Sequence, residues 1–239
     1  MERDYYDFHK DMQFRHWWFV GRRKIVEAFL GRNGGQRGGQ ILDIGSGYGS
    51  LIPTLRRFGD VDVIERLGDS HGRLRDLGAR QIYDLDFPSH CPPQRYDLVT
   101  LFDVLEHIED DYQALRTIRK NLLSPQGKCI LTVPACMWLW SKHDELNHHC
   151  RRYSGDGLID LLRRAGYNHI RSSYFMSLLF PLAVVDRLSS GFRRSPQAHI
   201  SPPRPRLNAL LGSIFGLESW AISRFRLPFG LSLIAEGQG

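Results

Sequence analysis

The sequence predicts an α/β fold in which a mostly parallel, doubly wound sheet is covered by helices on both faces. The first observation is that short apolar runs alternate with longer segments of helical spacing, as in parallel strands joined by crossover helices. The second is a glycine-rich turn at 45–49, directly after the first apolar run. The third is size, because 239 residues with 42% hydrophobic content suffice for one large domain with a full core. In such sheets ligands bind beyond the carboxyl ends of the strands.

The individual elements follow from the apolar period and from the residues that interrupt it. Helical spacing covers 19–30 and stops at the glycine-rich GRNGGQRGG, after which the short apolar run at 41–44 predicts the first strand. Further buried runs predict strands at 61–65, 81–83, 96–102, 128–134, 169–174 and 231–236. The segments between them predict helices at 50–57, 70–77, 111–123, 155–165, within 178–188, and at 207–225.

Composition narrows the class of protein. The net charge is +6, but its basic residues form only short clusters without a recognised nucleic-acid motif, which disfavours nucleic acid as a partner. Four cysteines without CxxC spacing indicate neither a disulfide framework nor a structural zinc module. The start of the chain does not resemble a secretion signal, and no apolar run is long enough to span a bilayer, so we expect a cytoplasmic enzyme. The Pro- and Arg-rich 193–206 predicts an exposed loop.

The glycine turn is the candidate cofactor site. Glycines at 45, 47 and 49 permit positive φ and a close approach of ligand to backbone, and a following helix would direct free N–H groups at that ligand. A dinucleotide fingerprint needs its third glycine at position 50, where this chain has Ser50. The stretch LDIGSGYGS resembles motif I of class I S-adenosylmethionine-dependent methyltransferases, which is an acidic residue, an apolar residue and then G-x-G-x-G.

Three further stretches, VDVIE, YDL and YDLVTLFDVLEH, resemble the same family in order. The resemblance implies that Glu65 binds the ribose and that Asp84, with Asp86 as second choice, binds the adenine. It also implies that Asp103 faces the methionine end. From the residues alone, Glu65 and Asp84 also suit helix caps or solvated turns, and Asp103 also suits the cap of a helix that starts at Val104. The predicted cofactor-binding residues are Asp43, Gly45, Ser46, Gly47, Gly49, Glu65, Asp84, Leu85, Phe102, Asp103, Trp18 and Arg22.

The segment before the first strand, FRHWWFVGRRK, combines aromatic and basic residues. Similar HWWF..GRR segments precede the core in a bacterial subgroup of the family that is associated with cell-surface glycan or polyprenyl-linked pathways. The resemblance implies a lid over cofactor and substrate, in which Arg22 or Arg23 pairs with the methionine carboxylate. The alternative is that Trp17, Trp18 and Phe19 fasten this helix to the core.

The loop after the fifth strand, WSKHDELNHHCRRY, carries three histidines, two carboxylates and a cysteine. Its histidines lack the spacing of H-E-x-x-H and Cys150 has no cysteine nearby, so we expect no metal site, although Asp144 and His148 have i, i+4 spacing. The loop resembles the D...H-x-R-R-Y pattern of the same subgroup, and that register favours His149 over His148.

This loop leaves the strand beside the predicted position of the cofactor methyl group. Transfer to a hydroxyl requires alignment of the nucleophile and removal of its proton, which a histidine oriented by a carboxylate can perform. The predicted catalytic residues are therefore His149, Asp144 and Tyr153, and the predicted substrate-binding residues are Trp17, Trp140, His148 and Arg152. The alternative is a network of hydrogen bonds that locks the loop over the pocket without touching substrate.

Taken together, the resemblance implies one methyltransferase domain over 1–239 with a Rossmann-like, seven-stranded sheet whose last strand is antiparallel. Its parts would be a lid and helix (1–37), a cofactor-binding core (38–174), a helical insertion (175–226) and the last strand (227–239). S-adenosylmethionine would be the cofactor and S-adenosylhomocysteine the product. We expect a small-molecule acceptor, methylated on a hydroxyl of a sugar, lipid-linked or secondary-metabolite scaffold.

Several alternatives stay open from the sequence. The sulfonium could serve a cyclisation, or the chain could be a non-catalytic binding protein, which the retained glycines and Glu65 argue against. An NAD-dependent oxidoreductase is disfavoured by Ser50. The apolar insertion suits core packing, a cover for the acceptor, a peripheral contact with a membrane surface or a dimer interface, so the chain is expected to be a monomer or a homodimer.

Overall fold

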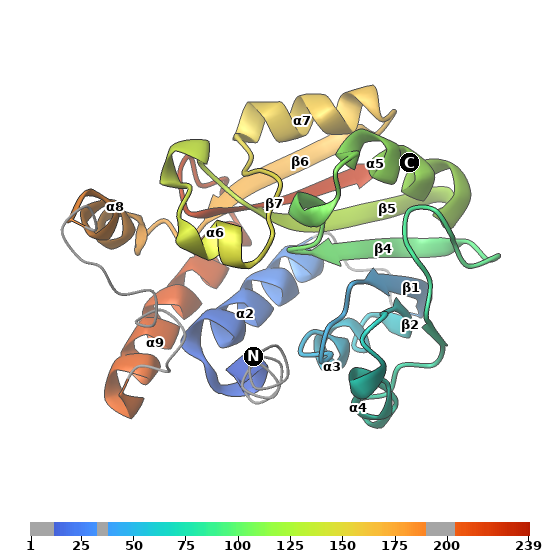
Figure 1. Cartoon of the computed structure of the whole chain (residues 1–239), viewed down its shortest axis with the longest axis horizontal. Coiled ribbons are helices and arrows are strands. Elements are labelled where there is room, and N and C mark those ends of the chain that lie inside the picture. Colours follow the sequence, from blue (N-terminus) through green and yellow to red (C-terminus); the bar gives the residue numbers. More distant parts are fainter. Residues whose placement is uncertain (1–11, 33–37, 190–203) are drawn as a thin grey trace.

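A computed structural model describes residues 12–32, 38–189 and 204–239 of the chain. The predicted lid residues 1–11, the segment 33–37 and most of the predicted exposed loop 193–206 lie outside these ranges. Figure 1 shows the strands side by side in one sheet, with α8 standing away from it. Over the described residues, no helix combines the length and the apolar composition that crossing a membrane would need.

One seven-stranded sheet with the order β3-β2-β1-β4-β5-β7-β6 organises the fold. Its strands are β1 (Gly39–Ile44), β2 (Gly59–Ile64), β3 (Ile82–Tyr83), β4 (Tyr96–Phe102), β5 (Leu123–Pro134), β6 (Asn168–Phe175) and β7 (Ser232–Gln238). The first five strands pair in parallel, and β7 is antiparallel to both β5 and β6. The predicted fold class, a mostly parallel sheet with an antiparallel last strand, is therefore confirmed.

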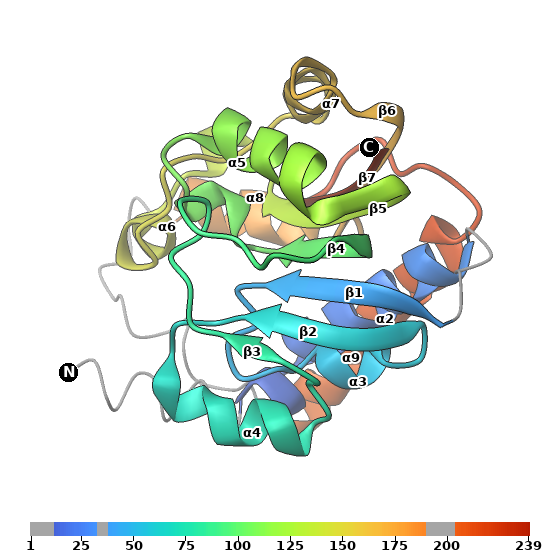
Figure 2. The same cartoon turned by 90° about the vertical axis from the view of Figure 1, so that its right-hand side faces the viewer.

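Helices cover both faces of the sheet, as Figure 2 shows. They are α2 (Trp17–Arg32), α3 (Ile52–Leu55), α4 (His71–Asp76), α5 (Asp111–Thr117), α6 (Lys142–Leu146), α7 (Gly155–Arg164), α8 (Phe180–Ser189) and α9 (Pro205–Ile222). Short 3₁₀ turns are η1 (Gly68–Ser70), η2 (Leu105–His107) and η4 (Met137–Leu139), and η3 (Ile118–Leu122) is a π turn.

Two hydrophobic clusters, one on each side of the sheet, form the core. One joins α5 and α7 to alternate residues of β4 and β5, and includes Leu115, Leu158 and Leu131. The other joins α2 and α9 to the opposite face and includes Phe29 and Phe215. Because successive strand residues point to opposite faces and both faces are covered, the central strands carry mainly apolar residues, with buried polar exceptions that include Asp43, Thr100 and Thr132.

The structure differs from the sequence prediction at three elements. The helix expected at 50–57 is limited to the four residues of α3, because β2 already begins at Gly59 and the chain must turn before it. The helix expected at 111–123 is α-helical only to Thr117 and then continues as the π turn η3. Finally, β5 begins at Leu123, where it pairs with Tyr96 across a register shift.

Candidate active site

The glycine turn lies at the carboxyl end of β1 and needs its glycines. Gly45, Gly47 and Gly49 have φ of 70°, 55° and 78°, in the left-handed region that side chains rarely adopt. A β-carbon on Gly45 would lie 2.6 Å from Cγ2 of Val104, the residue that leads into η2. The turn is therefore fixed in shape and packed against the segment that follows β4.

Asp43 holds this turn from beneath. Its carboxylate is buried, and it accepts hydrogen bonds from the Thr100 hydroxyl (2.7 Å) and the Ser46 hydroxyl (2.7 Å). Burial raises the pKa of Asp43 to about 6 although these hydrogen bonds oppose the shift. Both carboxylate oxygens accept hydrogen bonds inside the protein, so Asp43 positions the turn, and its predicted contact with the cofactor stays a prediction.

Glu65 follows β2 and reaches the glycine turn, as the sequence suggested. Its carboxylate accepts from the backbone N–H of Gly47 (2.5 Å) and of Leu67 (2.8 Å). Burial raises the pKa of Glu65. Asp84 is exposed at the end of β3, next to the half-buried Leu85.

Asp86, the second choice for the adenine, forms an exposed ion pair with Arg66 (2.6 Å). That pairing leaves Asp84 as the better-placed carboxylate of the two. The expectation that a following helix directs free N–H groups at the ligand is not supported. With four residues, α3 has no sustained dipole, and the Gly49 N–H already donates to the Ser46 carbonyl (2.9 Å).

The segment before α2 crosses the glycine turn, and the sequence did not single out its contact residue. Gln13 lies so close that a β-carbon on Gly47 would be 3.2 Å from its amide nitrogen. Arg23 donates to the Gln13 carbonyl (2.7 Å) and the Phe14 carbonyl (3.3 Å), and the Arg73 guanidinium lies 4.3 Å from the centre of the Phe14 ring. Arg23 therefore holds the predicted lid in place.

Arg22 and Asp103 form an ion pair beneath this segment. Asp103 has φ of 57° and also accepts from the Thr132 hydroxyl (3.1 Å), while η2 has no side-chain cap. The helix-cap alternative for Asp103 is therefore wrong. The Arg22 guanidinium lies 4.7 Å from the centre of the Trp18 ring, and its buried Nε has no hydrogen-bond partner among the described residues. A buried, incompletely paired guanidinium is suited to an anionic group.

Trp17 points to α9 rather than to an acceptor. Its ring lies 6.1 Å from that of Phe215, and its backbone N–H donates to Asn208 (2.9 Å). These contacts favour the alternative, that Trp17 fastens the helix to the core, and the prediction that it binds substrate stays a prediction. Phe102 is likewise buried in the core at the end of β4.

Asp144 is the centre of the loop after β5 and belongs to α6, which Figure 1 shows near the carboxyl ends of β4 and β5. The fully buried carboxylate accepts from Arg152 (2.7 and 2.9 Å), from His149 Nδ1 (3.0 Å) and from the Ser141 N–H (2.8 Å). Burial would raise its pKa, but the hydrogen bonds from His149 and Arg152 outweigh burial and hold the pKa of Asp144 well below its usual range. Asp144 therefore takes part in a hydrogen-bond network of the kind that the loop-locking alternative describes.

His149 is the histidine that this network orients. An ionised Asp144 can only accept, so Nδ1 of His149 carries a proton, and in the neutral ring the lone pair is on Nε2. Its ring lies 4.7 Å from that of His107, and the next residue's N–H, on Cys150, donates to the Glu106 carbonyl (2.7 Å). Glu106 is buried at 0% exposure, and neither of its carboxylate oxygens has a hydrogen-bond partner among the other described residues. The sequence analysis did not single out Glu106, because nothing in the sequence marks its burial.

The other predicted loop residues fall into two groups: Arg152 and Tyr153 are hydrogen-bonded inside the protein, whereas His148 and Trp140 are at least partly exposed. Arg152 uses its guanidinium on Asp144 and the Ala135 carbonyl (3.2 Å), so it locks the loop rather than offering itself to a substrate. Tyr153 is 6% exposed and donates to Asp111 (2.9 Å) at the start of α5. This buried position disfavours its predicted catalytic role, which stays a prediction. His148 is exposed with φ of 56°, and Trp140 is half-buried.

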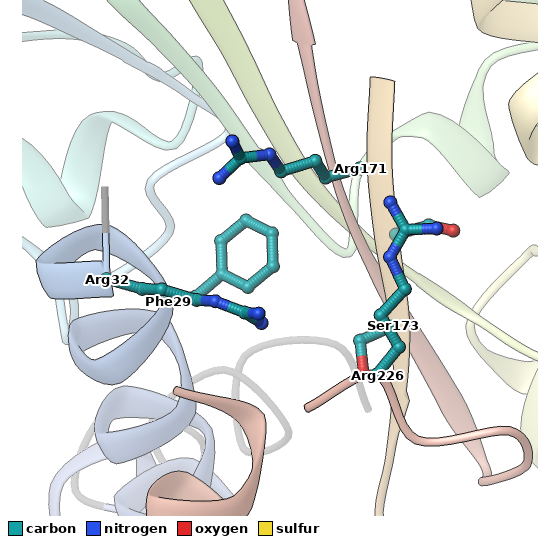
Figure 3. Close-up of a pocket in the computed structure, with 6 residues that line it drawn as sticks. Phe29, Arg32, Arg171, Ser173 and Arg226 are labelled. Atoms are coloured by element: carbon teal, nitrogen blue, oxygen red, sulfur yellow. The ribbon is translucent and has the colours of Figure 1, made fainter. Parts of the chain in front are cut away.

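A cavity of about 200 Å³ lies elsewhere, between the end of α2 and β6 (Figure 3). Arg32, Arg171 and Arg226 surround it with Phe29. None of the predicted cofactor or catalytic residues lines it, and Arg32 already donates to carbonyls at the end of α9, including that of Ile222 (3.1 Å). The candidate chemistry is therefore placed at the carboxyl edge of the sheet.

Comparison with known proteins identifies the family. The model of a family described as methyltransferase domain matches residues 14–172, from the lid segment to β6. The chain belongs to this methyltransferase family. Together with the sheet order, the match confirms the class I S-adenosylmethionine-dependent methyltransferase domain that the sequence predicted, with S-adenosylmethionine as its cofactor.

Among curated relatives of this methyltransferase domain is a ubiquinone biosynthesis O-methyltransferase of Aeromonas salmonicida. It is 32% identical over 42% of this chain and 45% of that protein. An N-terminal Xaa-Pro-Lys N-methyltransferase 1 of Danio rerio is 29% identical over 46% of this chain and 55% of that protein. The chain thus spans about half the length of these two relatives. An S-adenosylmethionine-dependent methyltransferase structure from Mesorhizobium loti has the same fold, with a TM-score of 0.58 at 17% identity, covering 89% of this chain and 96% of that one.

Proposed function

We propose that this protein transfers the methyl group of S-adenosylmethionine to a hydroxyl of a small acceptor on a sugar, lipid-linked or secondary-metabolite scaffold. The observation that carries the proposal is His149, held by the buried Asp144 in the tautomer whose Nε2 can accept a proton. A hydroxyl nucleophile needs such a group. The ubiquinone O-methyltransferase among the relatives supports a small-molecule oxygen acceptor.

The residues around the glycine turn fit the cofactor. The turn presents backbone without side chains, Glu65 supplies a carboxylate for the ribose hydroxyls, and Arg22 has an unpaired buried donor for the methionine carboxylate. When bound, the cofactor supplies an electrophilic methyl carbon on a positively charged sulfur. This chain's part is then to align the acceptor, exclude water beneath the segment held by Arg23, and take the hydroxyl proton at His149 Nε2.

We also infer that the chain belongs to the bacterial subgroup with HWWF..GRR and D...H-x-R-R-Y segments, and that it contacts a membrane surface peripherally. Support comes from α9, whose side away from α2 exposes the apolar Leu207, Leu210 and Leu217. Arg204 and Arg206 are exposed at the start of the same helix. An apolar stripe beside arginines is complementary to an anionic lipid surface, where a lipid-linked acceptor would be found.

Calorimetry with S-adenosylhomocysteine and with NAD tests the cofactor assignment. We expect binding of the first only, and failure to bind S-adenosylhomocysteine would overturn the proposal. An acceptor screen with radiolabelled methyl groups, using matched hydroxyl and amine compounds, then tests the reaction. A preference for amines would overturn the hydroxyl assignment.

The variant His149→Ala tests the proton acceptor. We expect unchanged S-adenosylhomocysteine affinity and turnover lower by about 10² to 10⁴-fold, the usual range for general base catalysis. The matched control is His90→Ala, which removes an exposed histidine from the loop before β4. Equal turnover of the two variants would exclude a catalytic role for His149 and leave only loop-locking.

A further inference from the structure

Three side chains able to bind a metal ion meet beyond the carboxyl end of β4. One ligand atom each of Glu106, His107 and His149 lies within 4.8 Å of those of the other two. Glu106 and His107 belong to η2, whereas His149 belongs to the loop that follows α6. Sequence spacing did not reveal this group, because the candidate histidines in the loop were compared with one another and not with the end of β4.

Glu106 lacks a partner that a buried carboxylate requires. It is fully buried, and neither oxygen has a hydrogen-bond partner among the other described residues. Such a group costs free energy unless it is protonated, paired or bound to a metal. The unpaired, buried carboxylate of Glu106 is therefore suited to bind a cation.

His149 supplies an independent observation. Its Nδ1 donates to Asp144, and that carboxylate is itself held by Arg152 and Ser141. A histidine that binds a metal commonly donates its other ring N–H to a carboxylate in this way, which fixes the tautomer and the ring orientation. Nε2 of His149 is therefore prepared to act as a ligand atom. The backbone bond from Cys150 to Glu106 (2.7 Å) fixes the two segments relative to each other.

We propose that Glu106, His107 and His149 form a binding site for a divalent transition-metal cation of the zinc class. Two imidazoles and one carboxylate are a donor set that suits Zn²⁺, while Mg²⁺ prefers oxygen ligands. In tetrahedral zinc sites with bonds of about 2.0 to 2.1 Å, ligand atoms are about 3.4 Å apart, so the three side chains draw together on binding. His107 is exposed and can make this movement.

The inference rests on the proposed function, since it concerns how the acceptor hydroxyl is activated at the same site. Three protein ligands leave the fourth position open, and an acceptor hydroxyl bound there loses its proton more readily. The O–H bond breaks and the proton passes to water. The oxygen lone pair forms the bond to the methyl carbon while the carbon–sulfur bond breaks, and its electron pair stays on sulfur as a neutral thioether. With the cation bound, His149 Nε2 is a ligand atom, and lowering of the hydroxyl pKa by the cation replaces the direct proton acceptance proposed for His149 without the cation; the methyl transfer to the hydroxyl is the same in both cases.

Cation titration of the full chain after treatment with a chelator tests the site without any turnover. Calorimetry with ZnCl₂ is expected to show one saturable site, and Co²⁺ is expected to give a visible absorption band from nitrogen ligation. Glu106→Gln keeps the shape of the buried side chain, and His107→Ala removes an exposed ring, so both are expected to fold. Each is expected to weaken zinc binding by about 100-fold or more. Glu145→Gln and His90→Ala, both exposed, are the matched controls.

Absence of a saturable site, equal weakening in the control variants, or tighter binding of MgCl₂ than of ZnCl₂ would overturn the inference. Failure of this proposal is distinguishable from failure of the proposed function. A protein that binds no zinc and still methylates a hydroxyl acceptor in the presence of chelator removes the metal site and keeps the reaction. A protein that binds zinc through Glu106 and His107 but methylates only amines keeps the metal site and removes the proposed hydroxyl reaction.

Discussion

Among single residues, buried carboxylates organise this site, and they do so in different ways. Asp43 ties the glycine turn to β4, and Asp144 holds the loop after β5 through Arg152 and His149. Glu106 has no such partners in the part of the chain that the structure describes. The satisfied carboxylates fix the backbone, whereas the unsatisfied one is available for a ligand.

Glu65 is the residue through which the ribose assignment can be tested. Glu65→Gln keeps the shape of the side chain but removes the charge that strengthens its hydrogen bonds. We expect the affinity for S-adenosylhomocysteine to fall by about 10 to 100-fold, the value of one or two charge-assisted hydrogen bonds. Calorimetry measures this change, and Glu27→Gln, on the exposed side of α2, serves as control. An affinity equal to that of the control would contradict the ribose role.

Asp43 predicts a pH-dependent stability. Burial raises its pKa to about 6 in the folded protein, from an ordinary value of 3.8. The folded state therefore binds more protons between these values, and the stabilisation from this group is present below pH about 4 and lost as the pH rises past about 6. The free energy of unfolding of the wild type, minus that of Asp43→Asn, should decrease by about 2 kcal/mol from pH 4 to 7. Urea unfolding at several pH values measures it, and a constant difference would contradict the prediction.

The position and role of a residue could be predicted from the sequence where a motif fixes the backbone. They could not be predicted where tertiary packing decides which residues meet. The glycine turn and the place of Glu65 followed from the spacing. By contrast, Tyr153 belongs to a conspicuous polar loop, yet its hydroxyl reaches α5 and its ring is buried. Gln13 and Glu106 were missed because their contacts come from segments distant in the chain.

At the scale of elements, the packing of α2 on α9 joins the lid segment to the late helical region. Figures 1 and 2 both show the two helices side by side. Gly21 on α2 permits the contact, because a β-carbon there would be 1.9 Å from the Phe215 ring. Phe215 is fully buried and stacks on Phe175 of β6. The predicted lid therefore depends on α9 for its position.

Alanine substitutions at two glycines of α2 are expected to change the stability of the protein in opposite directions. Gly21→Ala gains helix propensity but collides with Phe215, and overpacking of this kind costs about 1 to 3 kcal/mol, so we expect a net loss of stability. Gly31→Ala meets no atom within 4 Å and should stabilise the protein by up to about 1 kcal/mol. Thermal and urea unfolding of the two variants measure the difference, and equal effects would refute the packing argument.

The order and type of most elements could be predicted because each apolar run is bounded by clear interruptions, and the strand at 96–102 has the predicted bounds. The spacing of apolar residues along the chain could not predict the lengths of α3 and β5. The early start of β2 limits α3, and pairing of Leu123 with Tyr96 extends β5. Both are tertiary effects that override local propensity.

At the scale of the whole molecule, basic charge and exposed apolar side chains coincide on α9. Leu207, Leu210 and Leu217 are exposed along one side of that helix, and Arg224 covers Trp220 near its end, with 4.7 Å between the guanidinium and the ring centre. The net charge of +6 adds a long-range attraction to anionic surfaces. Surface and charge together favour a peripheral orientation on lipid.

Vesicle binding tests that orientation. We expect the protein to sediment with vesicles of equal parts phosphatidylserine and phosphatidylcholine, and to be released by high salt, because charge contributes to binding. Leu210→Asp should reduce binding by about five-fold or more. Leu146→Asp, on α6, changes a leucine with the same 57% exposure and serves as control. Equal loss in both variants, or a stable dimer that Leu210→Asp dissociates, would contradict the membrane assignment.

The position of β7 has a consequence for how the chain is made. β6 pairs with β7 alone, and β7 is separated from it in the sequence by residues 176–231. During synthesis on the ribosome β6 therefore emerges without a neighbour, and it exposes both backbone edges until β7 arrives and inserts between it and β5. Closure of the sheet is a late step, which makes the newly made chain dependent on chaperones for a longer time than its size alone would suggest.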